Sequence, residues 1–378
     1  MRKIFIIVNQ DSFFLSHRKE IALVASQNNY EVTIVANDTG YSDDIKALGL
    51  KFINLPINKT GTNLKEEYGT FRFLYKLFKN EKPDIVHLVG LKTIIWGGIA
   101  ARLTKINGYV SAVSGLGVTF SPEYKKKYIS QILIYLLKFI HNRRNVYCIF
   151  HNLDDMNLFV SRGIIKADRC YRTMGSGINL KEYEYYNEPK EGKIKIIFTA
   201  RMVEDKGVLT LINAANILKN KYNNLIEFIL CGGLETNPLA ITKERLEQLC
   251  DNSYIKWLGK RNDILEQLKQ SHIFAFPSYY KEGLPKSCIE AAAIGRPIIT
   301  CNSTGCKDTV IDGETGFLIP IKDENALAEK IKYLIDNPNI RVKMGIAARK
   351  FAENTFSIEN VIETHLHIYN QCLNTNNK

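Results

Sequence analysis

The chain has 378 residues, of which 45% are apolar and 24% are charged, and its formal net charge at pH 7 is +12. This composition is that of a soluble globular protein and excludes a fibrous or disordered chain. No stretch reaches the roughly 18 uninterrupted apolar residues of a membrane-spanning helix, and the length exceeds one ordinary core, so we expect two domains.

The positive charge is concentrated in the first half of the chain. Residues 1–180 contain 25 Lys and Arg against 14 Asp and Glu, a difference of +11, whereas residues 181–378 contain 26 against 25, a difference of +1. We therefore expect an anionic partner, either a membrane surface or nucleic acid, to meet the N-terminal half. Because residues 1–8 run directly into a strand pattern rather than a signal peptide, we expect a cytoplasmic protein.

Strand-like apolar runs alternate with helical patterns in residues 1–180, which predicts β-α units and a parallel sheet. The expected strands are Lys3–Asn9, Glu31–Ala36, residues 49–55, Asp84–Leu88, Tyr109–Val113 and Val146–Phe150. The expected helices are His17–Asn28 with Ser16 as its N-cap, Asp43–Leu48, Phe71–Lys79, Thr93–Leu103, Pro122–Phe139 and Asp154–Arg162.

The helix predicted at Pro122–Phe139 departs from this alternation. Lysines at 125–127 precede an apolar stripe, and Arg143-Arg144 follows it; the stripe comprises Ile129, Ile132, Leu133, Leu136, Leu137 and Ile140. One interpretation is a surface helix packed on its own domain. The other is an interfacial helix whose apolar face enters a membrane while its basic residues meet anionic lipid.

A second alternating series follows the tyrosine-rich connection Lys181–Lys193. Its expected strands are Ile194–Thr199, Glu227–Cys231, Ile255–Leu258, Ile273–Phe276 and Pro297–Thr300, and its helices are Gly207–Lys219, Thr242–Asp251, Asp263–Gln270 and Pro285–Ile294. The simplest α/β architecture is two Rossmann-like parallel-sheet domains facing a cleft, covering residues 1–180 and 193–355. Of the final helices Glu324–Asp336, Ile340–Glu353 and Ile358–Cys372, the last (residues 356–372) is expected to pack back on the first domain.

The stretch Glu282–Glu290 joins the predicted strand Ile273–Phe276 to a helix that begins at Pro285. In a parallel sheet this junction lies at the carboxyl edge, where the first-turn amides of Lys286 and Ser287 would face a phosphate. Glu282 and Glu290 do not suit a phosphate, so we expect them to hold hydroxyl groups. Hydroxyls beside a phosphate indicate a nucleotide sugar.

Basic residues follow the first strand of the second domain. Arg201 and Lys206 are expected at the same edge. There the planar guanidinium of Arg201, with its several donors, and the ammonium charge of Lys206 can stabilise a leaving diphosphate. A nucleoside can extend across the next loops, which contain Gly233, Asn237 and Arg261, and Asp263 is expected to cap a helix.

No metal motif is present in the sequence. It contains no Asp-x-Asp, no phosphate-binding P-loop and no His-x-x-x-His pair, and its eight cysteines form no Cys-x-x-Cys pair. We therefore expect no metal, no other cofactor and no disulfide framework, with the nucleotide sugar as a substrate.

Together, Arg201…Lys206, Gly232-Gly233, Pro277-Ser-x-x-x-Glu282-Gly-Leu-Pro and Glu282-x7-Glu290 resemble the family-4 retaining glycosyltransferases of the GT-B fold. His87–Lys92 and Ser114-Gly-Leu-Gly117 resemble the subgroup that extends undecaprenyl-diphosphate sugars, such as the N-acetylgalactosaminyltransferase that acts on lipid-linked bacillosamine. The resemblance implies that Arg201 and Lys206 hold the diphosphate, Glu290 the ribose and Glu282 the transferred sugar. Gly283, Leu284 and Pro285 complete the implied donor loop.

The sequence departs from the family where many members place a histidine after the strand Tyr109–Val113, because Ser114-Gly115 stands there. His17, His87 and Lys92 are the other candidates on the acceptor side. The implied reaction is a retaining, metal-independent transfer of an N-acetylhexosamine from a UDP-sugar to an undecaprenyl-diphosphate-linked saccharide in O-antigen, capsule or glycan synthesis. It would take place at the inner face of the membrane, with no nucleic acid involved.

Two other hypotheses remain open. A nucleotide-sugar epimerase on the same fold would convert the donor alone into an isomer and need no lipid acceptor. A basic binding protein without enzymatic activity would bind nucleic acid in a salt-dependent manner and be indifferent to the loss of Glu290.

Overall fold

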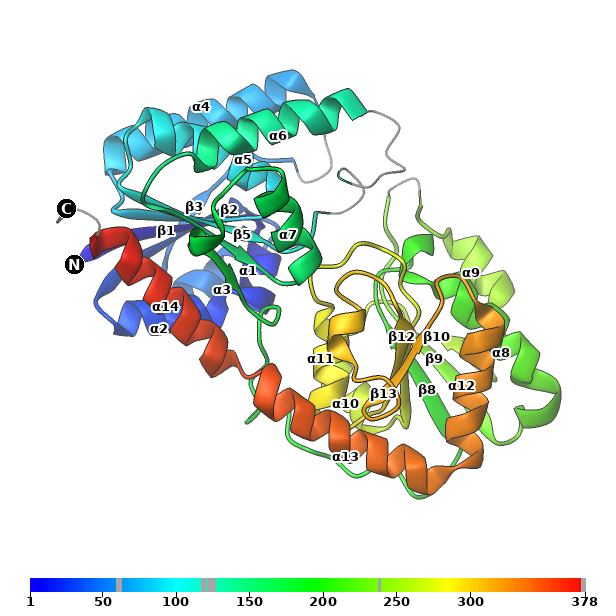
Figure 1. Cartoon of the computed structure of the whole chain (residues 1–378). Helices are drawn as coiled ribbons and strands as arrows, with labels where there is room; N and C mark the ends of the chain where they lie inside the picture. Colours follow the sequence, from blue (N-terminus) through cyan, green and yellow to red (C-terminus); the bar gives the residue numbers. More distant parts are fainter. Residues whose placement is uncertain (59–62, 117–119, 121–126, 237–238, 375–378) are drawn as a thin grey trace. The chain divides into compact units, whose positions relative to one another are not determined.

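The computed structural model describes residues 1–58, 63–116, 120, 127–236 and 239–374 (Figure 1). The chain divides into two compact units. Unit 1 comprises Met1–Gly177 and Ile358–Lys378, and unit 2 comprises Ile178–Ser357. The chain therefore passes between the units twice, once at residues 177–178 and once at residues 357–358.

Unit 1 is built on a seven-stranded sheet with the order β3-β2-β1-β4-β5-β6-β7. All of its neighbouring strands pair in parallel. The strands are β1 (Arg2–Gln10), β2 (Tyr30–Asn37), β3 (Lys51–Asn54), β4 (Ile85–Val89), β5 (Gly108–Val113), β6 (Val146–Phe150) and β7 (Cys170–Arg172). Every residue of β4, β5 and β6 is buried, as expected for strands covered on both faces.

Helices cover both faces of this sheet (Figure 1). One core includes residues from α4 (Leu64–Glu81), α5 (Leu91–Leu103), α6 (Lys127–His141) and α7 (Leu153–Ser161). The other includes residues from α1 (Asp11–His17), α2 (Lys19–Gln27), α3 (Ser42–Ala47) and α14 (Ile358–Asn374). The short 3₁₀ helix η2 (Ala167–Arg169) precedes β7.

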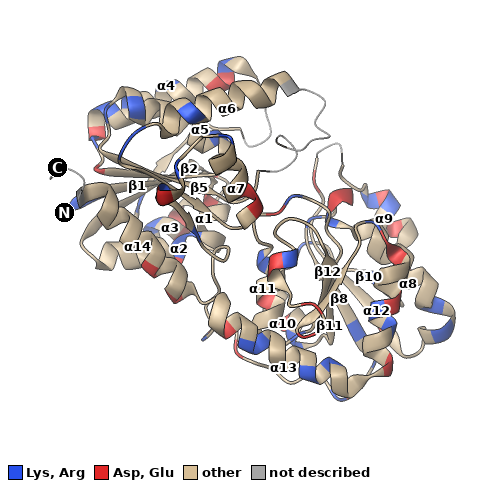
Figure 2. Cartoon of the chain, viewed as in Figure 1, with Lys and Arg blue, Asp and Glu red and all other residues tan. Residues whose placement is uncertain are grey.

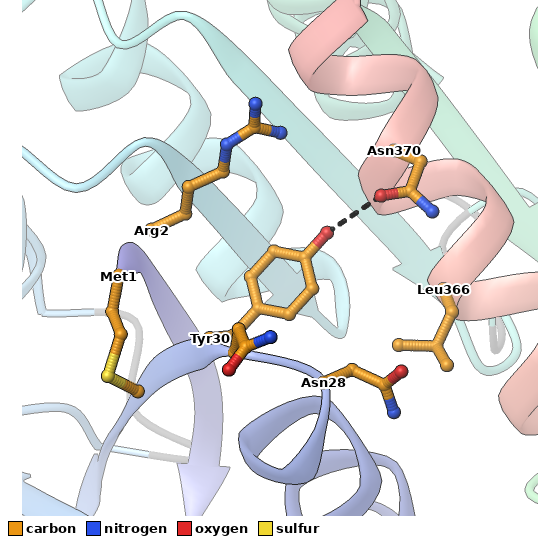
Figure 3. A pocket seen from close by; sticks show the side chains of 7 residues that line it. Met1, Arg2, Asn28, Tyr30, Leu366 and Asn370 are labelled. Carbon is orange, nitrogen blue, oxygen red and sulfur yellow. Dashed lines mark hydrogen bonds between the residues drawn. The ribbon is translucent and has the colours of Figure 1, made fainter.

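The last helix, α14, is tied to the amino edge of this sheet. The Tyr30 hydroxyl at the start of β2 donates a 3.1 Å hydrogen bond to Oδ1 of Asn370 (Figure 3). These two residues line a hollow together with Met1, Arg2, Asn28, Asn29 and Leu366. Since β1 and β2 begin here, the hollow lies at the opposite end of the strands from the carboxyl edge.

Unit 2 is built on a six-stranded parallel sheet with the order β10-β9-β8-β11-β12-β13. The strands are β8 (Ile194–Thr199), β9 (Ile226–Cys231), β10 (Ile255–Trp257), β11 (Ile273–Phe276), β12 (Ile298–Cys301) and β13 (Gly316–Ile319). The helices are α8 (Val208–Tyr222), α9 (Lys243–Leu249), α10 (Ile264–Lys269), α11 (Lys286–Ala293), α12 (Glu324–Asp336) and α13 (Pro338–Thr355), with short 3₁₀ turns η3 (Glu204–Lys206) and η4 (Lys307–Thr309). Helix α8 packs on α12, and α11 packs on α13.

The predicted fold class, two parallel-sheet α/β domains, is confirmed. The predicted cap at Ser16 is wrong, because Ser16 lies in the last turn of α1 and its hydroxyl donates to the carbonyl of Ser12. A break at the buried Arg18 separates α1 from α2. The short strands β7 and β13 were not predicted, since three or four residues give no clear periodic pattern.

Helix α6 is apolar on two faces. Its buried side includes Ile134, Leu137 and Ile140, whereas Ile132, predicted in the same apolar stripe, is 55% exposed. The predicted start of this helix and the three lysines at 125–127 fall outside the described residues, apart from Lys127, whose backbone begins α6. Among the helices described, none combines the length and apolar character needed to span a membrane.

Candidate active site

The loops that follow β8 and β11 lie next to each other, because β8 and β11 are adjacent in the sheet although β9 and β10 intervene in the chain. In an open parallel sheet, this reversal of strand order opens a crevice at the carboxyl edge where ligands bind. The β8 loop contains Arg201 and Lys206, and the β11 loop contains Glu282.

Backbone contacts lock these two loops together. The carbonyl of Asp205 accepts 3.0 Å hydrogen bonds from the amides of Tyr279 and Tyr280. Gly207 has a φ of +80°, and a Cβ there would lie 2.1 Å from the carbonyl oxygen of Pro277, so only glycine fits. The side chains that neighbour these contacts are therefore held at fixed separations.

Lys206 and Glu282 form a nearly buried ion pair across these loops. The ammonium of Lys206 donates to Oε1 of Glu282, and the two side chains are 10% and 12% exposed. Oε1 of Glu282 also accepts a 3.2 Å hydrogen bond from the Ser278 hydroxyl. The Lys206 ammonium lies 4.7 Å from the ring centre of Tyr280, in cation–π distance. Residues predicted from separate motifs thus come together in one group.

Helix α11 begins directly after Glu282. Gly283, Leu284 and Pro285 are buried, and Pro285 is the N-cap with an extended ψ of 116°, rather than the first helical residue as predicted. Lys286 and Ser287 occupy the first turn of this helix. The predicted orientation of their amides toward a phosphate remains a prediction.

Glu290 lies inside α11 and has a partner that sequence reasoning missed. Its side chain is 13% exposed, and its Oε1 accepts a 3.3 Å hydrogen bond from the hydroxyl of Tyr183. The ammonium of Lys286, one turn earlier, lies 3.7 Å from the same oxygen. Burial raises the pKa of Glu290, while the charge of Lys286 and the Tyr183 hydrogen bond act in the opposite direction. The need for a partner was readable from its apolar neighbours, but the identity of Tyr183 was not.

Arg201 is more open, with its side chain 45% exposed, and its Nη1 lies 3.1 Å from Oε1 of Glu235. Glu235 follows β9 and was not singled out from the sequence. A phosphate that binds Arg201 would compete with this carboxylate, so we add Glu235 to the candidate site residues.

The remaining predicted donor residues follow β9 and β10. The carbonyl of Gly233 accepts a 3.0 Å hydrogen bond from the amide of Met202, which ties the β9 loop to the β8 loop. Arg261 forms a bidentate salt bridge with Asp263, in which Nε lies 2.7 Å from Oδ1 and Nη2 lies 2.5 Å from Oδ2. Asp263 is the N-cap residue of α10, as predicted, although its carboxylate accepts no capping hydrogen bond from the helix backbone. Asn237 lies outside the described residues.

The candidates on the acceptor side all belong to unit 1. His87 is fully buried in β4, where its Nδ1 lies 2.7 Å from the Tyr369 hydroxyl of α14, so we correct its assignment from acceptor contact to core packing. Burial also lowers its pKa well below the usual value, which keeps the ring neutral. The ammonium of Lys92 pairs with Glu67 at 2.5 Å.

The other three candidates come after β1 or β5 in the chain. His17 ends α1, where its ring stacks on Phe13 with centroids 4.2 Å apart. Ser114 and Gly115 directly follow β5 and are partly exposed. Their contact with an acceptor remains a prediction.

The unit 2 edge therefore combines two cations, two nearly buried carboxylates and the start of a helix. Cations and first-turn amides suit a diphosphate, and carboxylates suit sugar hydroxyls. In the described part of the chain, no three His, Cys, Asp or Glu side chains gather as a metal site would need. The fold and this chemistry are those expected of an α/β enzyme that uses a nucleotide sugar.

Comparison with known proteins narrows this class. The family model described as glycosyl transferases group 1 matches residues 182–351, and the model described as glycosyl transferase 4-like matches residues 3–149. The chain is a glycosyltransferase of family 4 with the GT-B fold. The resemblance seen in the sequence is thereby confirmed.

Individual relatives match over most of their length. The N,N'-diacetylbacillosaminyl-diphospho-undecaprenol α-1,3-N-acetylgalactosaminyltransferase of Campylobacter jejuni is 28% identical, covering 95% of this chain and 98% of that one. The UDP-Gal:α-D-GlcNAc-diphosphoundecaprenol α-1,3-galactosyltransferase of Escherichia coli is 27% identical, covering 87% and 86%. HepE of Anabaena, crystallised with UDP and glucose, superimposes with a TM-score of 0.78 at 15% identity, covering 98% and 100%.

Proposed function

We propose that this glycosyltransferase moves an N-acetylhexosamine from a UDP-sugar to an undecaprenyl-diphosphate-linked saccharide in the synthesis of a surface glycan. The observation that carries the proposal is the Lys206–Glu282 pair at the carboxyl edge of unit 2, with Arg201 and Glu290 at the same edge. Both named relatives act on sugars linked to undecaprenyl diphosphate, and one of them uses UDP-galactose. The comparisons do not favour the epimerase hypothesis.

The proposed division of roles follows from charge. Lys206 and Arg201 bind the diphosphate and stabilise the negative charge that develops as it leaves. Glu282 orients Lys206 and accepts hydrogen bonds from hydroxyls of the transferred sugar, and Glu290 accepts them from the ribose. The two cations supply positive charge at the leaving group, so we propose that the reaction needs no metal ion.

The proposed stereochemical outcome is retention of the anomeric configuration. The bond from the anomeric carbon to the phosphate oxygen breaks, and the bond to the acceptor oxygen forms on the same face of the sugar. The freed phosphate oxygen takes the proton of the acceptor hydroxyl, which requires no further base. Arg201 and Lys206 hold that oxygen close to the reacting carbon.

Transfer assays test this proposal directly. The full chain is incubated with UDP-N-acetylglucosamine or UDP-N-acetylgalactosamine and an undecaprenyl-diphosphate saccharide, with and without EDTA, and the product anomer is assigned by NMR. We expect an α-linked product that is insensitive to EDTA, and loss of transfer in Arg201→Ala, Lys206→Ala and Glu290→Ala. Wild-type rates in all three variants would contradict the assigned roles, and isomerised donor without acceptor would indicate an epimerase.

We also propose that unit 1 meets the inner face of the cell membrane through α6. Tyr128, Ile132, Tyr135 and Phe139 are spaced by four, three and four residues and lie on one outer face, with exposed fractions of 64, 55, 69 and 44%. The guanidinium of Arg102 lies 4.2 Å from the ring centre of Phe139, and Figure 2 shows further basic residues on α4 and α6. Exposed aromatic groups beside cations are typical of a helix lying in an anionic lipid interface.

Vesicle flotation tests the membrane contact with a matched pair of variants. Ile132→Glu is compared with Ile217→Glu, since Ile217 of α8 is similarly exposed, at 50%, but lies in unit 2. We expect wild type and Ile217→Glu to float with vesicles that contain phosphatidylglycerol. Ile132→Glu should float at least about fivefold less, since an apolar side chain that enters the lipid interface in our proposal is replaced by a charged one. Equal flotation of both variants would overturn the proposal.

A further inference from the structure

The carboxylate of Glu290 accepts a hydrogen bond from a residue that does not belong to the loops at the carboxyl edge of unit 2. Its hydroxyl partner, Tyr183, lies 107 positions earlier in the sequence, in the segment that enters unit 2 from unit 1. That segment has no regular secondary structure at Tyr183, yet the tyrosine side chain is partly buried against α11. A connecting segment thus reaches the residue proposed to bind the ribose.

Tyr183 is fixed by more than this one contact. Nη1 of Arg349, in α13, donates to the carbonyl oxygens of both Tyr183 and Ala293, at 2.5 and 2.6 Å. Ala293 is the last residue of α11, so one guanidinium holds the connecting segment and the helix of Glu290 together. The amide of Tyr183 also donates to the carbonyl of Asn179 at 2.9 Å.

The same guanidinium is itself anchored. Nε of Arg349 lies 2.7 Å from Oε1 of Glu353, and the Arg349 side chain is 14% exposed. The backbone around Tyr183 is therefore restrained from both sides, and its hydroxyl has little freedom to leave Glu290. This restraint distinguishes the contact from an incidental surface hydrogen bond.

The groups around Glu290 act on it in opposite directions. Lys286 of α11 and the Tyr183 hydroxyl favour the ionised carboxylate, whereas burial and the neighbouring charge of Glu182 disfavour it. Arg349 of α13 faces backbone carbonyls rather than the carboxylate. An ionised carboxylate offers both oxygens as acceptors to two ribose hydroxyls, whereas protonation turns one of these oxygens into a donor. The hydroxyl of Tyr183 occupies Oε1, the oxygen that also faces Lys286, and so orients the carboxylate about its own axis.

We propose that Tyr183 is a positioning residue for nucleotide binding, which orients Glu290 and keeps it able to accept hydrogen bonds from the two ribose hydroxyls. This inference rests on the proposed function, in which Glu290 binds the ribose of a UDP-sugar. It assigns to the connecting segment a role that neither the sequence motifs nor the family resemblance indicated.

The test measures UDP affinity by isothermal titration calorimetry with the full chain between pH 5.5 and 8. The variant is Tyr183→Phe, and the matched control is Tyr185→Phe, which removes a hydroxyl from the same segment without touching Glu290. We expect Tyr183→Phe to weaken UDP binding about tenfold, because a hydrogen bond to a charged group is lost, and Tyr185→Phe to bind as wild type.

The pH profile and a modified ligand separate positioning from a general loss of structure. Without its hydroxyl donor the pKa of Glu290 rises further, so affinity for UDP should decline at a higher pH in Tyr183→Phe than in wild type as the solution is acidified. The variant should bind 2′,3′-dideoxy-UDP as wild type does, since that ligand has no ribose hydroxyls. A damaged fold would weaken both ligands equally.

The outcomes also separate this inference from the proposed function. If Glu290→Gln weakens UDP binding but Tyr183→Phe has wild-type affinity and pH profile, the positioning role is refuted and the donor site stands. If Tyr183→Phe weakens UDP and dideoxy-UDP alike, the positioning role is also refuted. If wild type shows no affinity for UDP, both the proposed donor and this inference fail.

Discussion

The variant Glu282→Gln tests how much the ion pair between Lys206 and Glu282 contributes to the stability of the fold. It removes the negative charge beside Lys206 while keeping the size of the side chain, and leaves an ammonium whose side chain is 10% exposed without its carboxylate. Removing one partner of a buried ion pair typically costs about 3–5 kcal/mol. The ring of Tyr280, 4.7 Å from the ammonium, compensates part of this charge, so we expect a loss of about 3 kcal/mol in the free energy of unfolding.

A double variant tests the other half of the reasoning. In Lys206→Met/Glu282→Gln neither charge of the pair is left without its partner, so most of that lost stability should return. Transfer should remain absent because the cation for the diphosphate is missing. As a control, Glu247→Gln breaks the Lys243–Glu247 pair, whose side chains are 60% and 58% exposed, and should change stability by less than about 0.5 kcal/mol.

The assay is urea unfolding followed by tryptophan fluorescence. The chain has two tryptophans, so in a Trp96→Phe background Trp257 of β10 alone reports on unit 2. Sugar transfer is measured on the same samples. The reasoning is refuted if Glu282→Gln costs less than about 1 kcal/mol, well below the range for a buried pair, or if the double variant transfers sugar.

Three further outcomes follow from the same edge of the sheet. Gly232→Ala should lower the melting temperature by several degrees or prevent folding, because its Cβ would lie 1.6 Å from a backbone carbonyl oxygen. In the control Gly233→Ala the new Cβ meets only a side chain, at 3.5 Å, so this variant should melt near wild type. Equal melting temperatures of the two variants would show that the loops can separate. Glu235→Gln should tighten UDP binding about threefold at low salt and less at high salt, since Arg201 loses a competing carboxylate; calorimetry showing weaker binding would contradict this competition. Because the folded pKa of Glu290 is raised, UDP affinity should decline as pH falls through that raised value, and Glu290→Gln should remove this decline; a persistent decline would implicate another group.

The sequence predicted five of the six strands of unit 2, and its carboxyl edge, because buried parallel strands are apolar runs whose ends must meet at one edge. Arg201, Lys206, Glu282 and Glu290 could be placed there from their order alone. Their partners could not, because those contacts join distant parts of the chain. Glu235, 34 positions from Arg201, is such a partner.

Local sequence patterns gave incorrect predictions for helices whose boundaries or buried faces depend on tertiary packing. The helix expected at His17–Asn28 corresponds to α2, and α1 before it was not predicted. The two helices are separated at Arg18, whose guanidinium is buried and donates to the carbonyl of His17. The apolar stripe of α6 was read as one face, but Ile132 is exposed and Ile134 is buried. A helix that is apolar on both faces offers no periodic contrast from which to choose its buried side.

The two carboxylates of the site are stabilised by partners of different kinds, and this difference suits their proposed roles. Glu282 is compensated by the full charge of Lys206. A diphosphate that binds the Lys206 ammonium therefore also changes the electrostatic environment of Glu282. The hydrogen bond of Glu290 to the neutral Tyr183 hydroxyl can persist when a nucleoside binds. We therefore expect the Glu282 side to respond to departure of the leaving group, while the Glu290 side holds the nucleoside throughout the reaction.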